Sequence, residues 1–351
     1  MKKILFTGGG SAGHVVPNIA LFEQLLSEGE TDVCYMGTNG IEKRILSEWK
    51  VPFYEIECPK LVRGGGISVW KRNAKIPFSF FRAVKDAKRG LRVLRPDAVF
   101  SKGGYVALPV VIAAWQMKIP CYAHESDFSA GLANRISARF CKKIFTSFPE
   151  TAKKLKRGAF SGAPVKRSVF ACTRAEARKK YGIGFQEKVL LVFGGGSGSE
   201  VINQAIRAQL KTLTKTFVVL HACGKGNLAD IREKGYIQTE FIKDMGTAYA
   251  CADAVVSRAG AGTVFELLAL KKPALLIPLE GQTRGDQIEN AEYFEKRGLC
   301  RVLKQSELSR LSEEAKNTLE DTELKKRLSA HEYPLGNERI LSELKRAIQN
   351  G

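Results

Sequence analysis

The densest group of ligand-binding residue types is a glycine-rich turn, Ser257–Glu266, which reads Ser-Arg-Ala-Gly-Ala-Gly-Thr-Val-Phe-Glu. It follows the short apolar run Ala252–Val256, which predicts a buried parallel strand. The apolar spacing from Thr263 to Leu270 predicts a helix. A strand, a glycine-rich turn and a helix N-terminus together form an anion site, because unpaired N–H groups point at the ligand and the helix dipole favours negative charge. The segment therefore predicts a phosphate site.

Glu266 has two interpretations. It lies one turn into the predicted helix, where its carboxylate can reach past a bound diphosphate to two neighbouring sugar hydroxyls. Thr263 and Glu266 also have the T-x-x-E spacing of a capping box, which explains both residues without a ligand. The polar segment Gly285–Asn290, which follows the next predicted strand, favours the ligand. Polar side chains after neighbouring strands converge on one crevice in an open α/β sheet.

A second candidate site lies at the start of the chain, where the loop Gly8–Gly13 follows the predicted strand Lys3–Thr7. Its glycines fit the dinucleotide pattern G-x-G-x-x-G, which is weak by itself. The next strand, Asp32–Met36, does not end in the acidic residue that binds a ribose, so a dinucleotide is disfavoured. His14 begins the following helix, whose positive end favours a neutral imidazole that can accept a proton. We interpret His14 as a general base for a sugar hydroxyl; the alternative is a histidine that only packs there.

The pattern of strands and helices occurs twice. Strands are predicted at 3–7, 32–36, 53–56, 97–101, 120–123, 143–146, 188–193, 216–220, 238–242, 252–256, 273–278 and 300–303. The segment Lys188–Ser197 repeats Lys3–Ser11, with the glycines offset by 186 residues from Gly8 to Gly194. We predict two doubly wound, Rossmann-like α/β domains facing each other across a cleft, at 1–163 and 164–351, joined by a charged connector from Lys166 to Glu187. Whether the last helix packs back on the first domain is left open.

The formal net charge is +20, and half of it falls in one segment. From Lys60 to Lys102 there are twelve Lys and Arg against two Asp, a net of +10. Nucleic acid and an anionic membrane surface are the obvious partners. No apolar window is long enough to span a bilayer, because the longest is interrupted by Pro109. The eight scattered cysteines indicate buried free thiols in a reducing cytosol, and no spacing of ligands predicts a metal site.

The basic segment favours the membrane over nucleic acid. It has no recognised nucleic-acid-binding motif, and a salt-dependent gel shift would test that alternative. The stretch Ile67–Arg82 mixes Trp70, Ile76, Phe78, Phe80 and Phe81 with Lys71, Arg72, Lys75 and Arg82. Aromatic residues beside cations suit the headgroup boundary of an anionic membrane. The alternative is that the aromatic side chains fill the core; a helix is predicted from Ser68 to Arg95, and Pro77 is expected to break it.

The motifs occur in an order that resembles the MurG family, and they cover nearly the whole chain. They are Gly-Gly-Gly-Ser-Ala-Gly-His (8–14), Lys-Gly-Gly-Tyr (102–105), His-Glu-Ser-Asp (124–127), Gly-Gly-Gly-Ser-Gly-Ser (194–199), Phe-Ile-Lys-Asp-Met (241–245), Arg-Ala-Gly-Ala-Gly-Thr-Val-Phe-Glu (258–266) and Gly-Asp-Gln (285–287). The resemblance implies an inverting GT-B transferase that moves N-acetylglucosamine from UDP-GlcNAc to the MurNAc 4-hydroxyl of lipid I, the pentapeptide-bearing diphospho-undecaprenol. The product is lipid II, for peptidoglycan synthesis. It further implies no cofactor, no metal, and a peripheral location on the anionic inner leaflet at the cytoplasmic face of the membrane.

The resemblance also implies roles for single residues. His14 would be the base, Ile242 would contact the uracil, and Glu266 would bind the ribose. The donor's diphosphate and GlcNAc would be held by Ala261, Gly262, Thr263, Asp286 and Gln287, with Ser11, Ala12 and Gly13 approaching the same donor. The acceptor would be bound by Gly103, Gly104, Tyr105, His124 and Glu125. For His124 and Glu125 a satisfied structural pair is an equal alternative. Lys102 adds charge beside these glycines or is a surface lysine.

Three further donor-side positions depart from the family pattern. Gly196 stands where a serine is usual, with Ser197 one place later, so a hydroxyl contact is lost or shifted. Asp127 stands where asparagine is common and adds negative charge near a diphosphate. Lys166 replaces the usual arginine, so a bidentate fork becomes a point charge, or moves to Arg167.

Another UDP-sugar GT-B enzyme, either a glycolipid synthase or a sugar-nucleotide epimerase, is the alternative within the enzymes. An epimerase needs no lipid acceptor, so its first domain needs no apolar and basic face.

Overall fold

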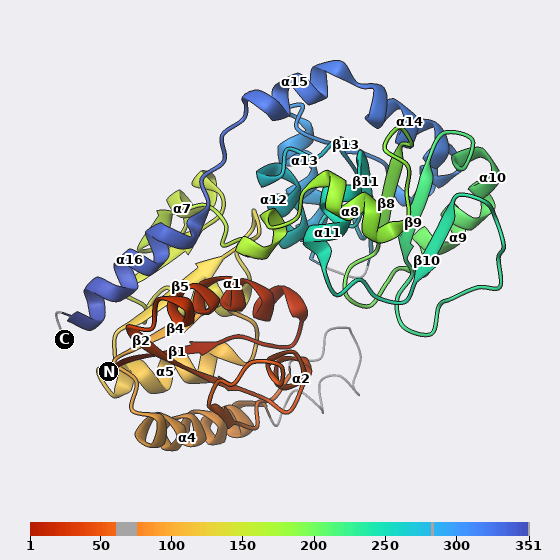
Figure 1. Cartoon of the computed structure of the whole chain (residues 1–351). Coiled ribbons are helices and arrows are strands. Elements are labelled where there is room, and N and C mark those ends of the chain that lie inside the picture. The colour runs from red at the N-terminus through yellow and green to blue at the C-terminus, as the bar shows by residue number, and fades with distance from the viewer. Residues whose placement is uncertain (61–75, 282–283, 350–351) are drawn as a thin grey trace, which may run out of the picture. The chain divides into compact units, whose positions relative to one another are not determined.

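The computed structural model describes residues 1–60, 76–281 and 284–349. The chain divides into two compact units, one made of Met1–Lys166 with Pro334–Gly351 and the other of Arg167–Tyr333 (Figure 1). All eight cysteines are unpaired, and six of them are buried. No described helix is both long and apolar enough to cross a membrane.

Within the described residues, the first unit is built on a seven-stranded sheet in the order β3-β2-β1-β4-β5-β6-β7, and every neighbouring pair is parallel. Its strands are β1 (Lys2–Thr7), β2 (Thr31–Gly37), β3 (Phe53–Glu55), β4 (Ala98–Ser101), β5 (Cys121–Glu125), β6 (Lys143–Thr146) and β7 (Gly158–Phe160). The order reverses between β1 and β4. In an open sheet of this kind, ligands bind outside the carboxyl ends of the strands at that reversal.

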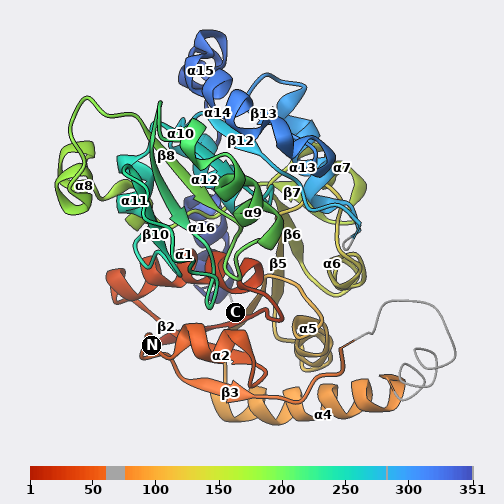
Figure 2. The same cartoon turned by 90° about the vertical axis from the view of Figure 1, so that its right-hand side faces the viewer.

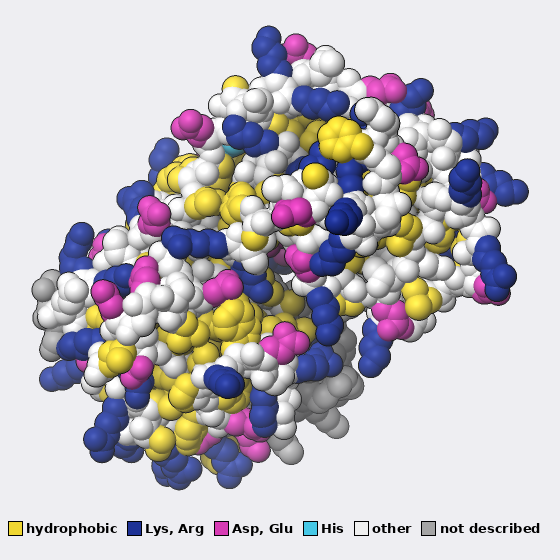
Figure 3. Space-filling model, viewed as in Figure 1, with side chains coloured by type: hydrophobic (Ala, Val, Ile, Leu, Met, Phe, Trp, Pro, Cys, Tyr) yellow, Lys and Arg dark blue, Asp and Glu magenta, His cyan; other side chains and the backbone are white. Residues whose placement is uncertain are grey.

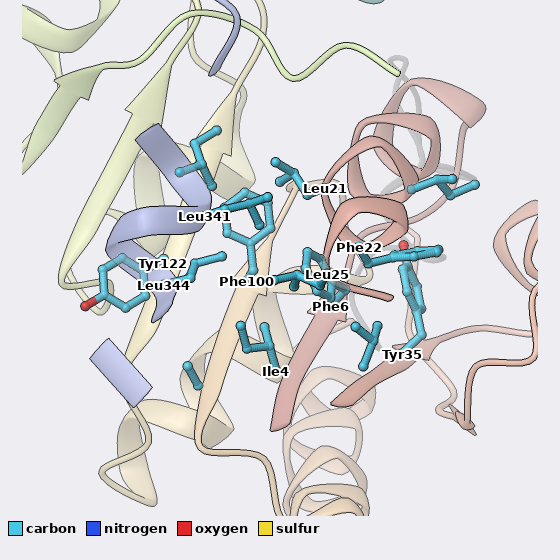
Figure 4. Packing of buried hydrophobic residues seen from close by; sticks show 14 of the residues in the cluster. Ile4, Phe6, Leu21, Phe22, Leu25, Tyr35, Phe100, Tyr122, Leu341 and Leu344 are labelled. Carbon is cyan, nitrogen blue, oxygen red and sulfur yellow. The ribbon is translucent and has the colours of Figure 1, made fainter. Parts of the chain in front are cut away.

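Helices cover both faces of this sheet, which explains why its strands are continuous apolar runs. They are α1 (Ala12–Glu28), α2 (Ile41–Leu46), α4 (Ile76–Leu94), α5 (Ala107–Gln116), α6 (Leu132–Ser137), α7 (Pro149–Lys154) and α16 (Gly336–Gln349). Ile4 and Phe6 point to the face covered by α1 and α16, whereas Leu5 points to the face covered by α4 and α5. Figure 4 shows Leu341 and Leu344 of α16 beside Phe100 and Tyr122.

The last helix belongs to the first unit, although 167 residues of the second unit, Arg167–Tyr333, precede it in the chain. Asn337, at its start, donates to the carbonyl oxygens of Ala20 and Val165 and accepts from the Val165 N–H, at 3.0 to 3.1 Å. A short parallel bridge joins Ala163 to Leu335 beside it. The chain passes between the two units twice, and these bonds fix both connecting segments to the first unit.

The described part of the second unit repeats the architecture with six parallel strands in the order β10-β9-β8-β11-β12-β13. Its strands are β8 (Val189–Phe193), β9 (Val218–Ala222), β10 (Tyr236–Thr239), β11 (Ala254–Ser257), β12 (Ala274–Leu276) and β13 (Arg301–Val302). Its helices are η1 (Arg167–Phe170), α8 (Arg174–Tyr181), α9 (Glu200–Ala208), α10 (Leu210–Leu213), α11 (Met245–Cys251), α12 (Ala261–Ala269), α13 (Asp286–Glu295), η2 (Gln305–Arg310), α14 (Leu311–Glu320) and α15 (Thr322–Ala330). Figure 2 shows β8 and β10 with α9 and α11 beside them. The reversal here lies between β8 and β11.

Two local predictions were wrong in detail. β7 was not predicted, because its three residues are too few to show a pattern. β10 begins at Tyr236 and ends at Thr239, since its register against β9 is set by the pair Tyr236 and Val219. The charged connector contains a helix, α8, which forms behind a capping box of Thr173 and Glu176. Pro77 is the second residue of α4, where its missing N–H costs nothing, and residues 68–75 of the helix predicted up to it lie outside the described residues.

Candidate functional site

The first candidate site is the turn between β1 and α1. Ser11 is the N-cap of α1, and Ala12, Gly13 and His14 are its first three residues. Gly10 has a positive φ of 83°, a conformation that glycine adopts without steric cost. The turn places His14 half-exposed at the carboxyl end of β1, next to the reversal of strand order.

The Nδ1 atom of His14 contacts two groups of its own loop. It lies 3.1 Å from the carbonyl oxygen of Gly9 and 3.0 Å from the Ser11 hydroxyl. A carbonyl oxygen can only accept a hydrogen bond, so the Gly9 contact requires a proton on Nδ1. In the neutral ring the other nitrogen, Nε2, then carries the lone pair. His14 is therefore arranged to accept a proton at Nε2.

The turn after β4 packs directly on this loop. Gly103 and Gly104 have φ values of 87° and 80°. A Cβ at Gly104 would lie 2.5 Å from the Gly9 carbonyl oxygen and 3.1 Å from His14 Nδ1, and one at Gly10 would lie 2.6 Å from the Tyr105 ring. Only glycines allow the two turns to approach this closely. The structure thus brings His14, Gly103, Gly104 and Tyr105 together.

Lys102 is buried, so the interpretation of a surface lysine is wrong. Its residue is 2% exposed, because it sits between the glycine turns after β1 and β4. Burial lowers the pKa of its ammonium group, and the nearby carboxylates of Glu125 and Asp127 oppose that shift. A lysine held at the base of two glycine turns contributes positive charge where an anion can approach backbone N–H groups.

His124 and Glu125 end β5 and are both buried. His124 donates from Nε2 to the Gly162 carbonyl oxygen at 3.1 Å, and burial lowers its pKa well below the usual value. Glu125 accepts from the backbone N–H groups of Asp127 and Gly131 and from the Asn134 amide at 2.9 to 3.0 Å. These contacts fit the structural alternative, in which the pair shapes the loop that carries the half-buried Asp127.

The second candidate site is the N-terminus of α12. The helix is capped by Gly260 and begins with Ala261, Gly262 and Thr263. A Cβ at Gly260 or Gly262 would meet no atom within 4 Å, so the space beside these N–H groups is open. Because a helix N-terminus has unpaired N–H groups and a positive dipole, this end is suited to a diphosphate.

Glu266 is not part of a capping box. The N-cap is Gly260 rather than Thr263, and no side chain caps the helix. The Tyr249 hydroxyl donates to Glu266 Oε2 at 2.8 Å. Tyr249 is buried, and this burial with the adjacent carboxylate raises its phenol pKa well above the usual value. Tyr249 therefore fixes the Glu266 carboxylate at the second turn of α12.

Arg258 connects the turns after three strands of the second sheet. Its Nη1 donates to the carbonyl oxygens of Ile277 and Pro278 at 3.1 and 3.0 Å, and its Nη2 donates to the Ser199 hydroxyl at 2.9 Å. Ser199 is the N-cap of α9, after β8, and Ile277 follows β12. Arg258 thus holds a buried positive charge between the N-termini of α9 and α12.

The other donor-side residues of the second unit lie in the turns and loops that follow its strands. Gly196 and Ser197 are exposed in the turn after β8, and Asp286 and Gln287 begin α13 behind Gly285, whose φ is 85°. Gln287 Oε1 accepts from the Leu279 N–H at 3.0 Å. Ile242, expected at the end of a strand, is buried in the loop after β10. Lys166 is the last residue of the first unit and is half-buried.

Several residues that shape these sites have no local sequence signal. Tyr249 is 17 residues from Glu266, and Ser199 is 59 residues from Arg258. Glu42, a buried carboxylate in α2, contacts the loop after β1 from 32 residues away. Its only hint in the sequence is an acidic residue close behind the segment Gly-Thr-Asn-Gly (37–40).

Comparison with known proteins gives matches along the whole chain. The Glycosyltransferase family 28 N-terminal domain matches residues 4–146, and the family's C-terminal domain matches residues 189–345. The Clostridium perfringens UDP-N-acetylglucosamine–N-acetylmuramyl-(pentapeptide) pyrophosphoryl-undecaprenol N-acetylglucosamine transferase is 44% identical over 314 residues, which cover 88% of this chain and 87% of that protein. A Bacillus anthracis protein of the same name, numbered 2, is 42% identical over 88% of both chains.

Solved structures are similar over almost the full length. The crystal structure of MurG from Acinetobacter baumannii has a TM-score of 0.75 and 27% identity, covering 99% of this chain and 100% of that one. The UDP complex of MnaA from Staphylococcus aureus has a TM-score of 0.69 at 15% identity, over 99% and 97% of the two chains, and shares the fold. The predicted fold class, two Rossmann-like α/β domains of the GT-B type, is confirmed.

Proposed function

Because the chain belongs to glycosyltransferase family 28 and, within it, to the MurG family, we propose that it transfers N-acetylglucosamine from UDP-GlcNAc to lipid I. The product is lipid II, and UDP is released. One observation carries the proposal: each sheet has a functional group at its strand reversal. An oriented base, His14, lies beside the reversal of the first sheet, and an open helix N-terminus, that of α12, lies beside the reversal of the second.

The second unit is the proposed donor site. The N–H groups of Ala261, Gly262 and Thr263 bind the diphosphate, and the buried guanidinium of Arg258 adds positive charge next to them. These groups are fixed before the reaction, so they stabilise the charge that develops on departing UDP without reorganising. Glu266 binds the ribose hydroxyls, Ile242 contacts the uracil, and Asp286 and Gln287 bind the GlcNAc hydroxyls. Gly196 and Ser197 complete the set in the second unit, and Asp127, Lys166 and the loop at 11–13 are the donor-binding residues that we propose in the first unit.

The first unit supplies the base and the acceptor site. The acceptor's 4-hydroxyl gives its proton to His14 Nε2 while its oxygen forms the bond to the anomeric carbon and the bond to UDP breaks. A single displacement of this kind inverts the anomeric centre. The N–H groups of Gly103 and Gly104 bind the acceptor's diphosphate, with Tyr105 beside them and Lys102 beneath. His124 and Glu125 act on the acceptor by holding the loop after β5.

We place the membrane-docking surface on the exposed face of α4. Phe78 and Phe81 are 74% and 72% exposed, and the basic residues Arg82, Lys85 and Arg89 follow on the same side of the helix. Figure 3 shows Lys and Arg side chains gathered along the lower edge of the molecule, where Figure 1 labels α4. Each such cation contributes about 1 kcal/mol near an anionic leaflet. Phe80 packs on the core, and residues 67–75 of the expected surface lie outside the described residues.

Incubation with UDP-GlcNAc and a short-chain lipid I analogue tests the proposal. We expect UDP and a disaccharide product whose new linkage is β, as read from the anomeric proton coupling. An α linkage would contradict inversion. Conversion of UDP-GlcNAc into an isomer in the absence of any acceptor would instead favour the epimerase alternative.

A further inference from the structure

Glu42 is a carboxylate with no exposed surface, and it lies beneath the loop that carries His14. It is the second residue of α2, after the N-cap Gly40, where the helix dipole favours negative charge. Its Oε1 accepts from the N–H of Thr38 at 2.9 Å and from the Thr38 hydroxyl, and its Oε2 accepts from the Gly10 N–H at 3.2 Å. One carboxylate therefore joins the turn after β2 to the turn after β1.

Glycines make the room that this carboxylate occupies. A Cβ at Gly9 would lie 2.5 Å from Glu42 Oε1, one at Gly37 would lie 2.9 Å from its Cγ, and one at Gly40 would lie 3.2 Å from Oε2. The close approach at Gly9 is the important one, because Gly9 also supplies the carbonyl that contacts His14. Glu42 thus sits against the peptide unit that joins Gly9 to Gly10.

The direction of that peptide decides the state of His14. Glu42 accepts from the N–H of Gly10, and the carbonyl of the same Gly9–Gly10 peptide points the opposite way, to His14 Nδ1 at 3.1 Å. In a planar trans peptide the N–H and C=O groups are antiparallel, so fixing one fixes the other. If this peptide rotated, Nδ1 would lose its acceptor, and the Ser11 hydroxyl, 3.0 Å away, could donate to it instead.

We infer that Glu42 is a positioning residue that orients the Gly9–Gly10 peptide, selects the Nδ1–H tautomer of His14 and so leaves Nε2 unprotonated. This inference rests on the proposed function for its catalytic consequence, because an Nε2–H tautomer cannot accept the acceptor's proton. The tautomer itself is a property of the resting protein and is measured without substrate.

The test is a long-range proton–nitrogen correlation spectrum of protein labelled with ¹⁵N-histidine, at a pH where the imidazoles are neutral. The chain has four histidines, and a His14→Gln variant assigns the signal of His14. We expect the Nδ1–H pattern in the parent and a shift toward Nε2–H in Glu42→Gln, which keeps the size of the side chain but turns one acceptor into a donor. Glu48→Gln, at an exposed glutamate just after α2, is the matched control and should leave the signal unchanged.

Kinetics separate this role from a general loss of structure. In Glu42→Gln, kcat should fall by about 10- to 100-fold, the effect expected when a group that orients a reacting residue is removed. The KM for UDP-GlcNAc should change less than kcat, because the proposed diphosphate-binding groups after β11 are in the other unit and only the loop at 11–13 is near Glu42. Thr38→Val removes one donor to Glu42 and should produce a smaller change of the same kind, so it replaces Glu42→Gln if that variant fails to fold.

An unchanged His14 tautomer in a folded Glu42→Gln or Thr38→Val variant would overturn the inference, even if activity fell. A changed tautomer together with full activity would support the positioning of His14 by Glu42 but contradict His14 as the base. The two failures are therefore distinguishable.

Discussion

The polar residues that define both candidate sites are each held in one orientation by a partner within their own unit. His14 is held by the Gly9 carbonyl, Glu266 by the Tyr249 hydroxyl, and Arg258 by two carbonyls and the Ser199 hydroxyl. Buried polar groups are costly unless they are paired, so these bonds stabilise the fold and orient the groups at once. A substitution that keeps the hydrogen bond to this partner should therefore affect ligand binding without destabilising the fold, so the two effects can be measured separately.

His14→Ala should lower kcat by about 10²- to 10⁴-fold, as expected for the loss of a general base. Affinity for UDP should be nearly unchanged, since His14 belongs to the first unit and the proposed diphosphate site to the second. Steady-state rates and a UDP titration measure the two effects. His331→Ala, in the second unit, is the control. Turnover within a few-fold of the parent would assign His14 a packing role.

Glu266→Ala should weaken UDP-GlcNAc binding by about 1–3 kcal/mol, the cost of leaving polar partners unpaired. Titration calorimetry measures it, with Glu292→Ala, an exposed glutamate of α13, as the control. Glu266→Gln keeps an oxygen that can accept from Tyr249, so it should retain more stability while still losing affinity. Unchanged donor affinity in both folded variants would leave Glu266 only as the partner of Tyr249.

At the scale of the elements, side-chain hydrogen bonds join strands to neighbouring strands and helices. In the second unit, His221 of β9 contacts the Tyr236 hydroxyl of β10 through Nδ1 at 2.9 Å and Asn203 Oδ1 of α9 through Nε2 at 3.0 Å. Asn203 in turn donates to the Cys223 carbonyl oxygen, and Cys223 lies against the glycine turn after β8 at Gly198. This network aligns β9, β10 and α9 beneath the proposed donor site.

The His221 network predicts a loss of stability in acid. Burial lowers the pKa of His221 from 6.5 to about 4. Between these values the unfolded chain binds a proton that the folded chain does not, so stability falls as the pH decreases from 6.5 to 4. The loss should be about 3 kcal/mol between pH 7 and pH 4.

Hydrogen exchange of the β9 amides, corrected for its intrinsic pH dependence, measures this loss locally. His221→Asn should remove most of the additional acid sensitivity, because asparagine does not titrate. Equal acid slopes for the parent and His221→Asn would show that His221 does not carry the effect.

At the scale of the whole molecule, the uneven charge and the exposed face of α4 both bear on binding to a surface outside the protein. A net charge of +20 attracts the chain to anionic surfaces, and exposed aromatic residues give it an apolar anchor there. The exposed aromatic residues and the cations are adjacent on one helix. Cations that only form the solvated edge of a domain would not need exposed aromatic residues beside them. This arrangement supports peripheral binding through α4.

Replacing Phe78 and Phe81 with serine, and Arg82 and Lys85 with glutamine, should reduce sedimentation with anionic liposomes. Turnover of a long-chain acceptor should slow, whereas turnover of a short, water-soluble acceptor should survive. Lys325→Gln with Lys326→Gln removes two exposed charges in the second unit and is the control. Equal loss on both acceptors would show that the substitutions damage the fold or the site and not membrane docking, and unchanged sedimentation would exclude α4 as the docking surface.

The sequence by itself determined the parts of this protein that depend on local pattern. Apolar runs bounded by glycine and proline predicted most strands, and the repeat of Lys3–Ser11 at Lys188–Ser197 predicted two Rossmann-like domains. The glycine turns that carry His14 and that open α12 were visible because φ values and close approaches of the backbone restrict the residue type directly. For the same reason the family resemblance was readable from short motifs.

Only the tertiary structure decided which charged residues are buried and what holds them. Lys102 looked exposed because nothing nearby in the sequence covers it, whereas two glycine turns from separate strands enclose it in the fold. The roles of Glu42, Tyr249 and Arg258 depend on atoms 17 to 59 residues away along the chain. The physical reason is that strand order brings distant loops to one sheet edge, and a local pattern contains no information about that order.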